Sequence, residues 1–336
     1  MIRVINESTN PYFNLALEEY LLKELDLGDD IFMLWQNSPA VIVGRNQNTW
    51  DEINHQFVKE NGIAVVRRLT GGGAVYHDLG NLNFTFIARG MKAGHYDFES
   101  FARPVVAALR SLGVEAEFSG RNDILVDGKK VSGNAQYRYG DSVLHHGTLL
   151  FDSDISNMVR ALNVSPEKLV KKGVASVRSR VTNIKEHLPR PLGMEEFKAA
   201  LVKALFQAEG NHNAEYRLSE RDLARVEELV RTKYGTWEWN YGASPGYNLR
   251  RSRRFEWGKL DVLLDIREGK IISCKIYGDF FGKEEISGLE ERLQGLPYEE
   301  TALRQTLAEA DLSSYISGLD IYTMMQLLMG DPMKAI

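Results

Sequence analysis

The sequence predicts an α+β protein with one large domain and a small α+β domain at its C-terminus. A chain of 336 residues is long enough for both. Strand-like runs and runs with helical spacing of apolar residues follow one another through most of the sequence. The basic run at 250–254 is typical of a linker. We therefore expect a large domain at 1–247, a linker at 248–254 and the small domain at 255–336.

The first 60 residues predict short strands and two helices. Residues 2–5 favour a strand, and Asn10 followed by proline is a typical helix start. The apolar runs 31–36 and 40–43 are separated by turn-forming residues and predict a hairpin. A second helix is expected at 51–60, because Asn-Gly follows it.

A loop of three glycines, at 71–73, lies between strand-like runs at 63–67 and 82–87. Without Cβ atoms, the loop can turn sharply and present its N–H groups to a phosphate or carboxylate. Arg67 and Arg68 enter the loop and would add the formal positive charge that amide dipoles lack. The alternative is a plain connection between two strands.

Asp127-Gly128 is a strong hairpin turn signal between two strand-like runs at 124–126 and 129–132. Strand alternation places Lys129 and Lys130 on opposite faces, so one is solvated and the other can point into a site. An inward ammonium group is costly unless it meets an anion. Lys130 is therefore a candidate anion-binding residue, and two exposed hairpin lysines are the alternative.

A long strand is expected at 142–151, where His145 and His146 point to opposite faces. At most one of them can join a given site, which makes a metal-binding pair unlikely in the sequence pattern. The basic segment 171–183 has no regular period and is a candidate lid around an anion, or else a solvated loop.

The remaining chain is mostly helical, with one strand pair. We expect helices at 97–112, 194–208 and 219–233, a strand pair at 255–264 and 270–277, and helices through most of 284–329. Candidate core residues in the last segment are Leu289, Leu293, Leu303, Leu307, Ile321, Met325 and Leu328.

Composition limits the function. The net charge of −5 argues against a dedicated nucleic-acid binder, so any anion site must be local. Cys274 is the only cysteine, which excludes a disulfide framework and a cysteine-based metal cluster. The N-terminus lacks a signal peptide pattern, and no apolar run approaches membrane-spanning length. We expect a cytoplasmic protein, a monomer, with no membrane or nucleic-acid partner.

Several motifs together resemble the lipoate-protein ligases, and the resemblance spans nearly the whole chain. They are Arg-Arg-Leu-Thr-Gly-Gly-Gly-Ala-Val-Tyr-His-Asp at 67–78, Asn-Asp-Ile at 122–124, Lys-Val-Ser-Gly at 130–133, His-His-Gly-Thr at 145–148 and Ser-Val-Arg-Ser-Arg-Val-Thr-Asn at 176–183. The resemblance implies the fold shared by biotin ligases and lipoyl or octanoyl transferases, a large catalytic domain with mixed sheets flanked by helices.

The activity implied has two steps. ATP and lipoate give lipoyl-AMP and pyrophosphate, and the lipoyl group then passes to a lysine of an acceptor domain. The implied acceptors are the E2 subunits of 2-oxoacid dehydrogenases and the glycine cleavage H protein. Magnesium is expected with ATP, with Asp123 as a candidate ligand.

The resemblance also carries roles to individual residues. It implies a central role in catalysis for Lys130, which would contact both nucleotide and lipoate. The other implied ATP-binding residues are Arg68, Gly73, Ala74, Val75, Tyr76, Arg178 and Arg180, of which the last two lie in the adenylate-binding loop at 171–183. The other implied lipoate-binding residues are Trp35, Gly71, Gly72, His77 and His146, with an apolar tunnel near Trp35 and Leu17.

Other functions on the same fold stay open at this stage. An octanoyl or lipoyl transferase or amidotransferase would not need ATP, and the cysteine-dependent ones would need a reactive thiolate, for which Cys274 is badly placed. A biotin ligase normally carries a Gly-Arg-Gly-Arg-x-Gly loop, which is missing here. A module that binds lipoyl domains without catalysis would require a damaged site, whereas Arg68, the glycines and Lys130 are all present.

Overall fold

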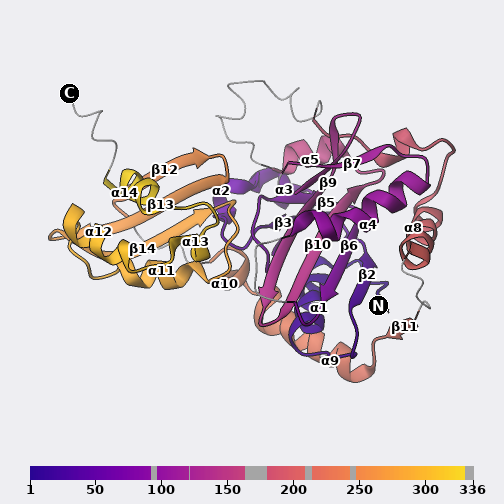
Figure 1. Ribbon diagram of the computed structural model, residues 1–336, viewed down its shortest axis with the longest axis horizontal. Coiled ribbons are helices and arrows are strands. Elements are labelled where there is room, and N and C mark those ends of the chain that lie inside the picture. Colours follow the sequence, from indigo (N-terminus) through magenta and orange to yellow (C-terminus); the bar gives the residue numbers. More distant parts are fainter. Residues whose placement is uncertain (92–96, 121, 163–179, 209–213, 243–246, 330–336) are drawn as a thin grey trace. The chain divides into compact units, whose positions relative to one another are not determined.

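The computed structural model describes residues 1–336 except 92–96, 121, 163–179, 209–213, 243–246 and 330–336 (Figure 1). The chain divides into two compact units. The N-terminal unit contains Met1–Ile42, Trp50–Arg67 and Val75–Asn240, and the C-terminal unit contains Val43–Thr49, Arg68–Ala74 and Tyr241–Ile336. The glycine loop therefore groups with the C-terminal unit, although the sequence suggested that it belongs to the large domain.

The N-terminal unit is built on a mixed eight-stranded sheet with the strand order β11-β1-β2-β6-β10-β9-β8-β7. Strand β1 runs parallel to both of its neighbours, and the remaining pairs are antiparallel. The strands are β1 (Ile2–Ile5), β2 (Ile31–Trp35), β6 (Asn81–Ala88), β7 (Ala116–Ser119), β8 (Asp123–Val126), β9 (Lys129–Tyr139), β10 (Ser142–Leu150) and β11 (Ala214–Arg217). This confirms the expected mixed sheet and the hairpin at Asp127-Gly128.

A second sheet has the order β4-β3-β5, from β3 (Ala40–Val43), β4 (Ala64–Arg67) and β5 (Val75–His77). The predicted hairpin of 31–36 with 40–43 is therefore wrong, because β2 pairs with β1 and β6 in the large sheet. The buried side chain of Asn14 holds the turn between the two runs by donating to Gln36 O and Asn37 Oδ1. This long-range contact redirects the chain, and local turn signals do not reveal it.

Helices cover both faces of the large sheet. Helix α1 (Pro11–Lys23) begins at Asn10, whose side chain accepts hydrogen bonds from the N–H groups of Tyr12 and Phe13. Helices α4 (Phe98–Ser111) and α8 (Met194–Ala208) pack on the opposite face. The two adjacent histidines of β10 confirm this arrangement, because the His145 ring stacks on Phe101 of α4 while His146 contacts Glu18 of α1.

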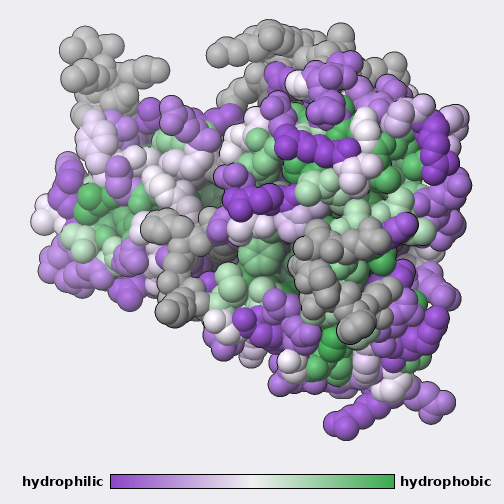
Figure 2. All heavy atoms as spheres, turned by 45° about the vertical axis from the view of Figure 1, so that its right-hand side comes forward, coloured by the Kyte–Doolittle hydropathy of each residue, from purple (hydrophilic) through white to green (hydrophobic). Residues whose placement is uncertain are grey.

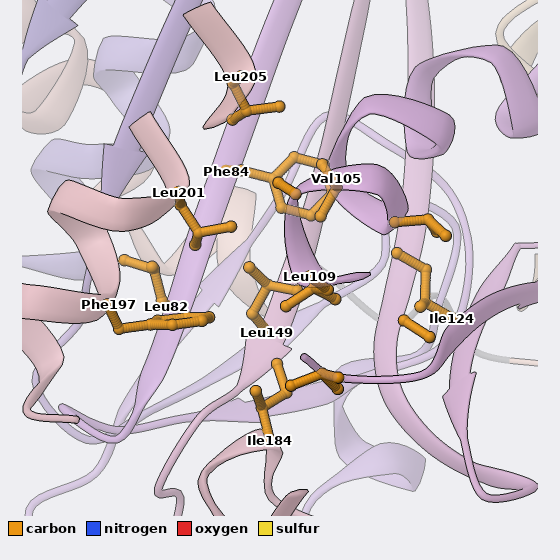
Figure 3. Packing of buried hydrophobic residues seen from close by; sticks show 14 of the residues in the cluster. Leu82, Phe84, Val105, Leu109, Ile124, Leu149, Ile184, Phe197, Leu201 and Leu205 are labelled. Atoms are coloured by element: carbon orange, nitrogen blue, oxygen red, sulfur yellow. The ribbon is translucent and has the colours of Figure 1, made fainter. Parts of the chain in front are cut away.

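The main core lies between the large sheet and helices α4 and α8 (Figure 3). The side chains labelled there come from β6, β8, β10, α4, α8 and the short 3-10 helix η1 (Ile184–His187): Leu82, Phe84, Val105, Leu109, Ile124, Leu149, Ile184, Phe197, Leu201 and Leu205. Close packing of these apolar groups fixes the strands that carry the candidate site residues on the other face.

The helix predicted at 51–60 is interrupted. It forms as α2 (Thr49–Glu52) and α3 (His55–Glu60), because Ile53 bridges to Leu162 after helix α5 (Ile155–Ala161) and Asn54 caps α3 through its side chain. The helix predicted at 219–233 becomes α9 (Glu220–Leu229) followed by the π-helical turn η2 (Val230–Tyr234) and α10 (Trp237–Asn240).

The C-terminal part, from β12 onward, is a three-stranded antiparallel sheet with helices on one face. It contains β12 (Leu249–Phe255), β13 (Gly258–Arg267), β14 (Lys270–Gly278), α11 (Ile286–Leu293), α12 (Glu300–Ala308), α13 (Leu312–Tyr315) and α14 (Ile321–Met329). The predicted core residues Leu289, Leu293, Leu303, Leu307, Met325 and Leu328 are buried here, and Ile321 packs against them partly exposed. The small α+β domain is thereby confirmed.

The linker predicted at 248–254 is wrong in its structure, because 249–255 form the edge strand β12. Two of its arginines are paired with carboxylates: Arg250 lies 3.1 Å from Asp261, and Arg254 lies 3.2 Å from Asp279. A charged edge strand resists pairing with other chains, so the basic run is compatible with a sheet.

On the face drawn in Figure 2, hydrophilic side chains cover most of the surface, with smaller hydrophobic areas between them.

Candidate active site

Lys130 lies at the start of β9, where it is half-buried while Lys129 is exposed, as strand alternation predicts. Its Nζ lies 2.7 Å from Oδ1 of Asp123 on the neighbouring strand β8. Its backbone also binds the end of the 171–183 segment: the Lys130 N–H donates to Arg180 O at 2.7 Å, and the Thr182 N–H donates to Lys130 O at 3.1 Å. Residues 171–179 of that segment, Arg178 among them, lie outside the described residues.

A β-bulge sets the direction of the Lys130 side chain. Asp123 pairs with Gly133 and Ile124 with Ser132, but Leu125 pairs with Lys130, so one extra residue stands in β9. Residues three positions apart in a regular strand point to opposite faces, and the extra residue cancels this difference. The amine therefore folds over Gly133, where an added Cβ would lie 2.9 Å from Nζ.

A buried chain of hydrogen bonds links three strands to α1. The Trp35 Nε1–H donates to Thr85 Oγ1 at 2.8 Å, and the Thr85 hydroxyl donates to Glu18 Oε1 at 2.6 Å. His146 Nδ1 lies 3.0 Å from both carboxylate oxygens of Glu18, which makes it the donor. All four residues are less than a tenth exposed. Two of the residues implied for lipoate binding are thus joined through groups that the sequence analysis did not name.

His77 belongs to the same cluster. Its ring meets the Trp35 ring edge to face at 6.1 Å, and its Nδ1 lies 3.0 Å from Nδ2 of Asn37. Asn37 is held in turn by Asn14 of α1. The structure therefore brings Trp35, His77 and His146 together, as the resemblance implied, with α1 as the common support.

Sequence reasoning missed Glu18, because a carboxylate on an amphipathic helix normally faces solvent. The available signal is the composition of α1, in which ten of the thirteen residues are buried and Glu18 and Glu19 stand side by side. Glu19 points to the other side of the helix and binds Lys233 at 2.6 Å and the Tyr234 hydroxyl at 2.7 Å. Consecutive acidic residues in an otherwise apolar helix indicate buried polar networks on two sides of it.

The glycine loop is tightly folded within the C-terminal unit. Arg68 turns into its own loop: its Nε donates to Thr70 Oγ1 at 2.8 Å, and its Nη2 donates to the carbonyls of Gly71 and Gly73 at 2.6 and 2.9 Å. Gly72 has a φ of +88°, and a Cβ on Gly71 would lie 2.3 Å from Phe280 O. These positions require glycine for a positive φ and for close backbone approach.

The neighbours of the loop have more structural roles than the sequence suggests. Arg67 is buried and donates from Nε to Trp239 O at 2.9 Å and from Nη2 to Asn240 O at 3.1 Å. Ala74 ends the loop segment, and Val75 and Tyr76 lie in β5. Burial, with Asp78 and Asp154 nearby, raises the pKa of Tyr76 to about 12, so its hydroxyl stays protonated. That the loop and Lys130 act on one intermediate stays a prediction, since they belong to different units.

Family models match both parts of the chain. A family model described as the lipoyl protein ligase A/B catalytic domain matches residues 10–206, and a model of the bacterial lipoate protein ligase C-terminus matches residues 244–328. Fold, lysine site and matches together define an enzyme of the ligase class. The chain belongs to the lipoate-protein ligase family. The lipoate-protein ligase LplJ of Bacillus subtilis is 46% identical over 321 residues, which cover 95% of this chain and 97% of the relative.

Solved structures with the same fold are also similar. The crystal structure of P. falciparum LipL1 in complex with lipoate has a TM-score of 0.76 at 27% identity and covers 92% of this chain and 94% of its own. Lipoate-protein ligase A bound with ATP has a TM-score of 0.63 at 29% identity, covering 72% and 98%. A bipartite ligase from Thermoplasma acidophilum, described with its E2 lipoyl domain, has a TM-score of 0.65 at 30% identity, covering 74% and 98%.

Proposed function

We propose that this lipoate-protein ligase activates lipoate with ATP and then transfers the lipoyl group to a lysine side chain of an acceptor domain. A lipoate carboxylate oxygen attacks the α-phosphorus, lipoyl-AMP forms and pyrophosphate leaves. The acceptor amine then attacks the acyl carbonyl carbon, an amide forms and AMP leaves. The observation that carries the proposal is the 46% identity to a lipoate-protein ligase over nearly the whole chain.

Lys130 is the residue that we assign to both steps. In the first step its ammonium group offsets the negative charge that builds up when a carboxylate approaches the α-phosphate. In the second step it stabilises the acyl oxygen as this becomes an oxyanion. The half-buried position of Lys130, on a strand fixed by pairing on both sides, supports this role because a preorganised donor needs little rearrangement during the reaction.

The cluster of Trp35, His77, His146, Glu18 and Thr85 is the proposed wall of the lipoate chain site. Its hydrogen bonds pair the indole N–H of Trp35, the Thr85 hydroxyl, the Glu18 carboxylate and Nδ1 of His146, which leaves ring faces and aliphatic groups to contact an apolar chain. We further assign lipoate binding to Gly71 and Gly72. We assign nucleotide binding to Arg68, Gly73, Ala74, Val75, Tyr76, Arg178 and Arg180. The loop glycines suit this role because backbone N–H groups can approach phosphates closely where no Cβ intervenes.

Magnesium is the expected counter-ion for the nucleotide. Among the described residues, no three His, Cys, Asp or Glu side chains gather into a metal site. This fits an ion held mainly by phosphate oxygens and water. When bound, the ion supplies charge neutralisation at the phosphates.

The proposed acceptors are lipoyl domains, namely the E2 subunits of 2-oxoacid dehydrogenases and the glycine cleavage H protein. The similar bipartite ligase of Thermoplasma acidophilum, whose structural study includes its E2 lipoyl domain, supports this class of partner. We also propose that the protein works in the cytoplasm as a monomer. None of the helices described here has the length and apolar character needed to cross a bilayer.

The transferases that use a cysteine thiolate are a poor alternative for this chain. Cys274 is buried in β14, and burial, with Glu290 nearby, raises the pKa of its thiol to about 12. A thiol with this pKa is almost entirely protonated at neutral pH and is a weak nucleophile. Cys274 is also the only cysteine of the sequence.

The test is ATP-dependent modification of a panel of acceptor domains, read by intact mass. We expect a lipoyl-mass increase that requires ATP, lipoate and the acceptor lysine. Modification from an octanoyl or lipoyl carrier protein without ATP would contradict the proposal and favour a transferase. Adenylate formation without any acceptor modification would support the first step and reject the second.

A further inference from the structure

We propose that Asp123 is a positioning residue that holds the amine of Lys130 over Gly133, ready for the reaction. This inference rests on the proposed function and names a residue through which the lysine site works. It depends on the strand pair β8 and β9 and on residues next to it, all within the N-terminal unit.

The first argument is the pairing itself. Asp123 and Gly133 are directly opposite in the register of β8 and β9. The Asp123 side chain therefore lies on the same face of the sheet as the space that a side chain at Gly133 would fill. The bulge brings Lys130 to that face, and its Nζ lies 2.7 Å from Asp123 Oδ1. Without the extra residue in β9, the lysine would point to the other face, away from its carboxylate.

The second argument is the environment of the carboxylate. Asp123 Oδ1 is shielded from solvent and, among the described residues, accepts no hydrogen bond of good geometry. Its close neighbour is the ammonium group of Lys130, and the Lys130 side chain is 38% exposed. A shielded carboxylate oxygen needs a compensating charge. The lysine supplies it, while an exposed lysine alone would sample many rotamers.

The third argument is the rigidity of the support. Asn122, next to Asp123, and Asn134, next to Gly133, bind each other through side chain and backbone: Asn122 Nδ2 donates to Asn134 O at 2.6 Å, and Asn134 Nδ2 donates to Asn122 O at 3.0 Å. Asn134 Oδ1 also accepts a hydrogen bond from Nε2 of the buried His145 at 3.1 Å. The Asp123 carboxylate and the backbone at Gly133 are therefore fixed relative to each other.

The chain offers two independent ways to disturb the amine. Asp123→Asn removes the charge but keeps the shape of the side chain. Gly133→Ala adds a methyl group 2.9 Å from Nζ and 3.1 Å from Cε, and both atoms belong to the flexible end of Lys130, so the strand can survive while the amine moves. Lys129→Ala on the exposed face is the control, and thermal melting of each variant checks that the fold persists.

The measurement is lipoate-dependent pyrophosphate release, with kcat and both KM values. We expect either variant to lower kcat by about tenfold, a change of ~1.4 kcal/mol in barrier, with KM changes within about threefold. The double variant should be no slower than about twice the worse single variant, because both act through the position of one amine. In Asp123→Asn, Lys130 should also react faster with acetic anhydride than it does in the wild type. The reaction rate of Lys129 in the same protein is the reference.

Three results would overturn the inference. They are wild-type kcat in Asp123→Asn, fully multiplicative losses in the double variant, or a higher magnesium requirement in Asp123→Asn but not in Gly133→Ala. The last two would make Asp123 a direct participant or a magnesium ligand instead. Failure of the proposed function looks different, because the wild-type protein itself would then release no pyrophosphate with lipoate and ATP.

Discussion

Nδ1 of His146 lies 3.0 Å from both carboxylate oxygens of Glu18, in the interior between β10 and α1. The same carboxylate accepts the hydroxyl of Thr85, which accepts the indole N–H of Trp35. One carboxylate thus orders side chains from three elements of the proposed lipoate site. This explains why a charged residue occupies a buried position in α1: it is the common acceptor for groups that would otherwise be unsatisfied.

Replacement of Glu18 by alanine should weaken lipoate binding more than ATP binding. The change removes the carboxylate that orients His146 and Thr85, so the side chains of the proposed lipoate site lose their fixed positions. The KM for lipoate should rise about tenfold, equivalent to ~1.4 kcal/mol. The KM for ATP should stay within about twofold. Steady-state kinetics with each substrate varied provides the measurement, and Glu7→Ala at an exposed position is the control. An equal rise in the KM values of lipoate and ATP would contradict the assigned position of the lipoate chain.

Asp222 should contribute stability that is lost only in strong acid. Burial alone would raise the pKa of its carboxyl group, but hydrogen bonds from Tyr20, Tyr216 and Ser219 outweigh this and lower the pKa to about 2 from 3.8. A group with a depressed folded-state pKa stabilises the fold above its unfolded pKa, and this contribution disappears as the pH falls from about 4 to 2.

Asp222→Asn should therefore lower the free energy of unfolding at pH 7 by about 1–2 kcal/mol, after allowance for screening by solvent. The decline of stability between pH 4 and pH 2 should also become flatter than in the wild type. Urea unfolding at several pH values measures both effects, and the exposed Asp26→Asn serves as the control. If the variant loses stability between pH 4 and pH 2 as steeply as the wild type, the hydrogen bonds around Asp222 do not stabilise its ionised carboxylate.

His145 should remain neutral in the folded protein well below its ordinary titration range. Complete burial, and secondarily the adjacent His146, hold its pKa well below 6.5. Because Gln136 Nε2 donates to Nδ1, the proton sits on Nε2 and is donated to Asn134. The unfolded state takes up a second imidazole proton below pH 6.5 while the folded state does not, so stability falls with decreasing pH in that range. Imidazole nitrogen shifts in NMR should show the Nε2–H tautomer at pH 5.5, and a protonated ring there would refute it.

Cys274 should be dispensable for catalysis. Its buried thiol, with a pKa of about 12, should resist iodoacetamide at pH 8 until the protein is unfolded. Cys274→Ala should retain the wild-type kcat for lipoyl transfer while losing about 1 kcal/mol of stability from the small cavity. Activity assays and mass spectrometry of the alkylated protein test this. Loss of transfer with a stable fold would restore the thiolate mechanism as an explanation.

The sequence predicts those features of the fold that depend on local signals. The start of α1 at Asn10, the Asp127-Gly128 hairpin and the opposite orientation of His145 and His146 all follow from residues near one another in the chain. The wrong predictions concern partners that are distant in sequence. Runs 31–36 and 40–43 join different sheets, and the basic run at 250–254 becomes a strand once its arginines meet Asp261 and Asp279.

The candidate site shows the same division. Lys130 can be selected from alternation and motif, but its orientation depends on a β-bulge, which no local pattern of residue types reveals. The acidic pair in α1 indicates a buried carboxylate, but the partners of Glu18 lie on β6 and β10 and follow from long-range packing. Arg67 looks like a second phosphate ligand, yet it binds the carbonyls of Trp239 and Asn240 more than 170 positions later in the chain.

The most direct test of the central claim compares purified wild-type protein, Lys130→Ala and Lys129→Ala for lipoate-dependent release of pyrophosphate from ATP. The two lysines are adjacent, and the exposed one is the matched control. We predict that Lys130→Ala loses pyrophosphate release by at least about a thousandfold with an unchanged melting temperature, while Lys129→Ala stays within about twofold of the wild type. Release by Lys130→Ala at the wild-type rate would contradict the role of this amine in forming the acyl adenylate.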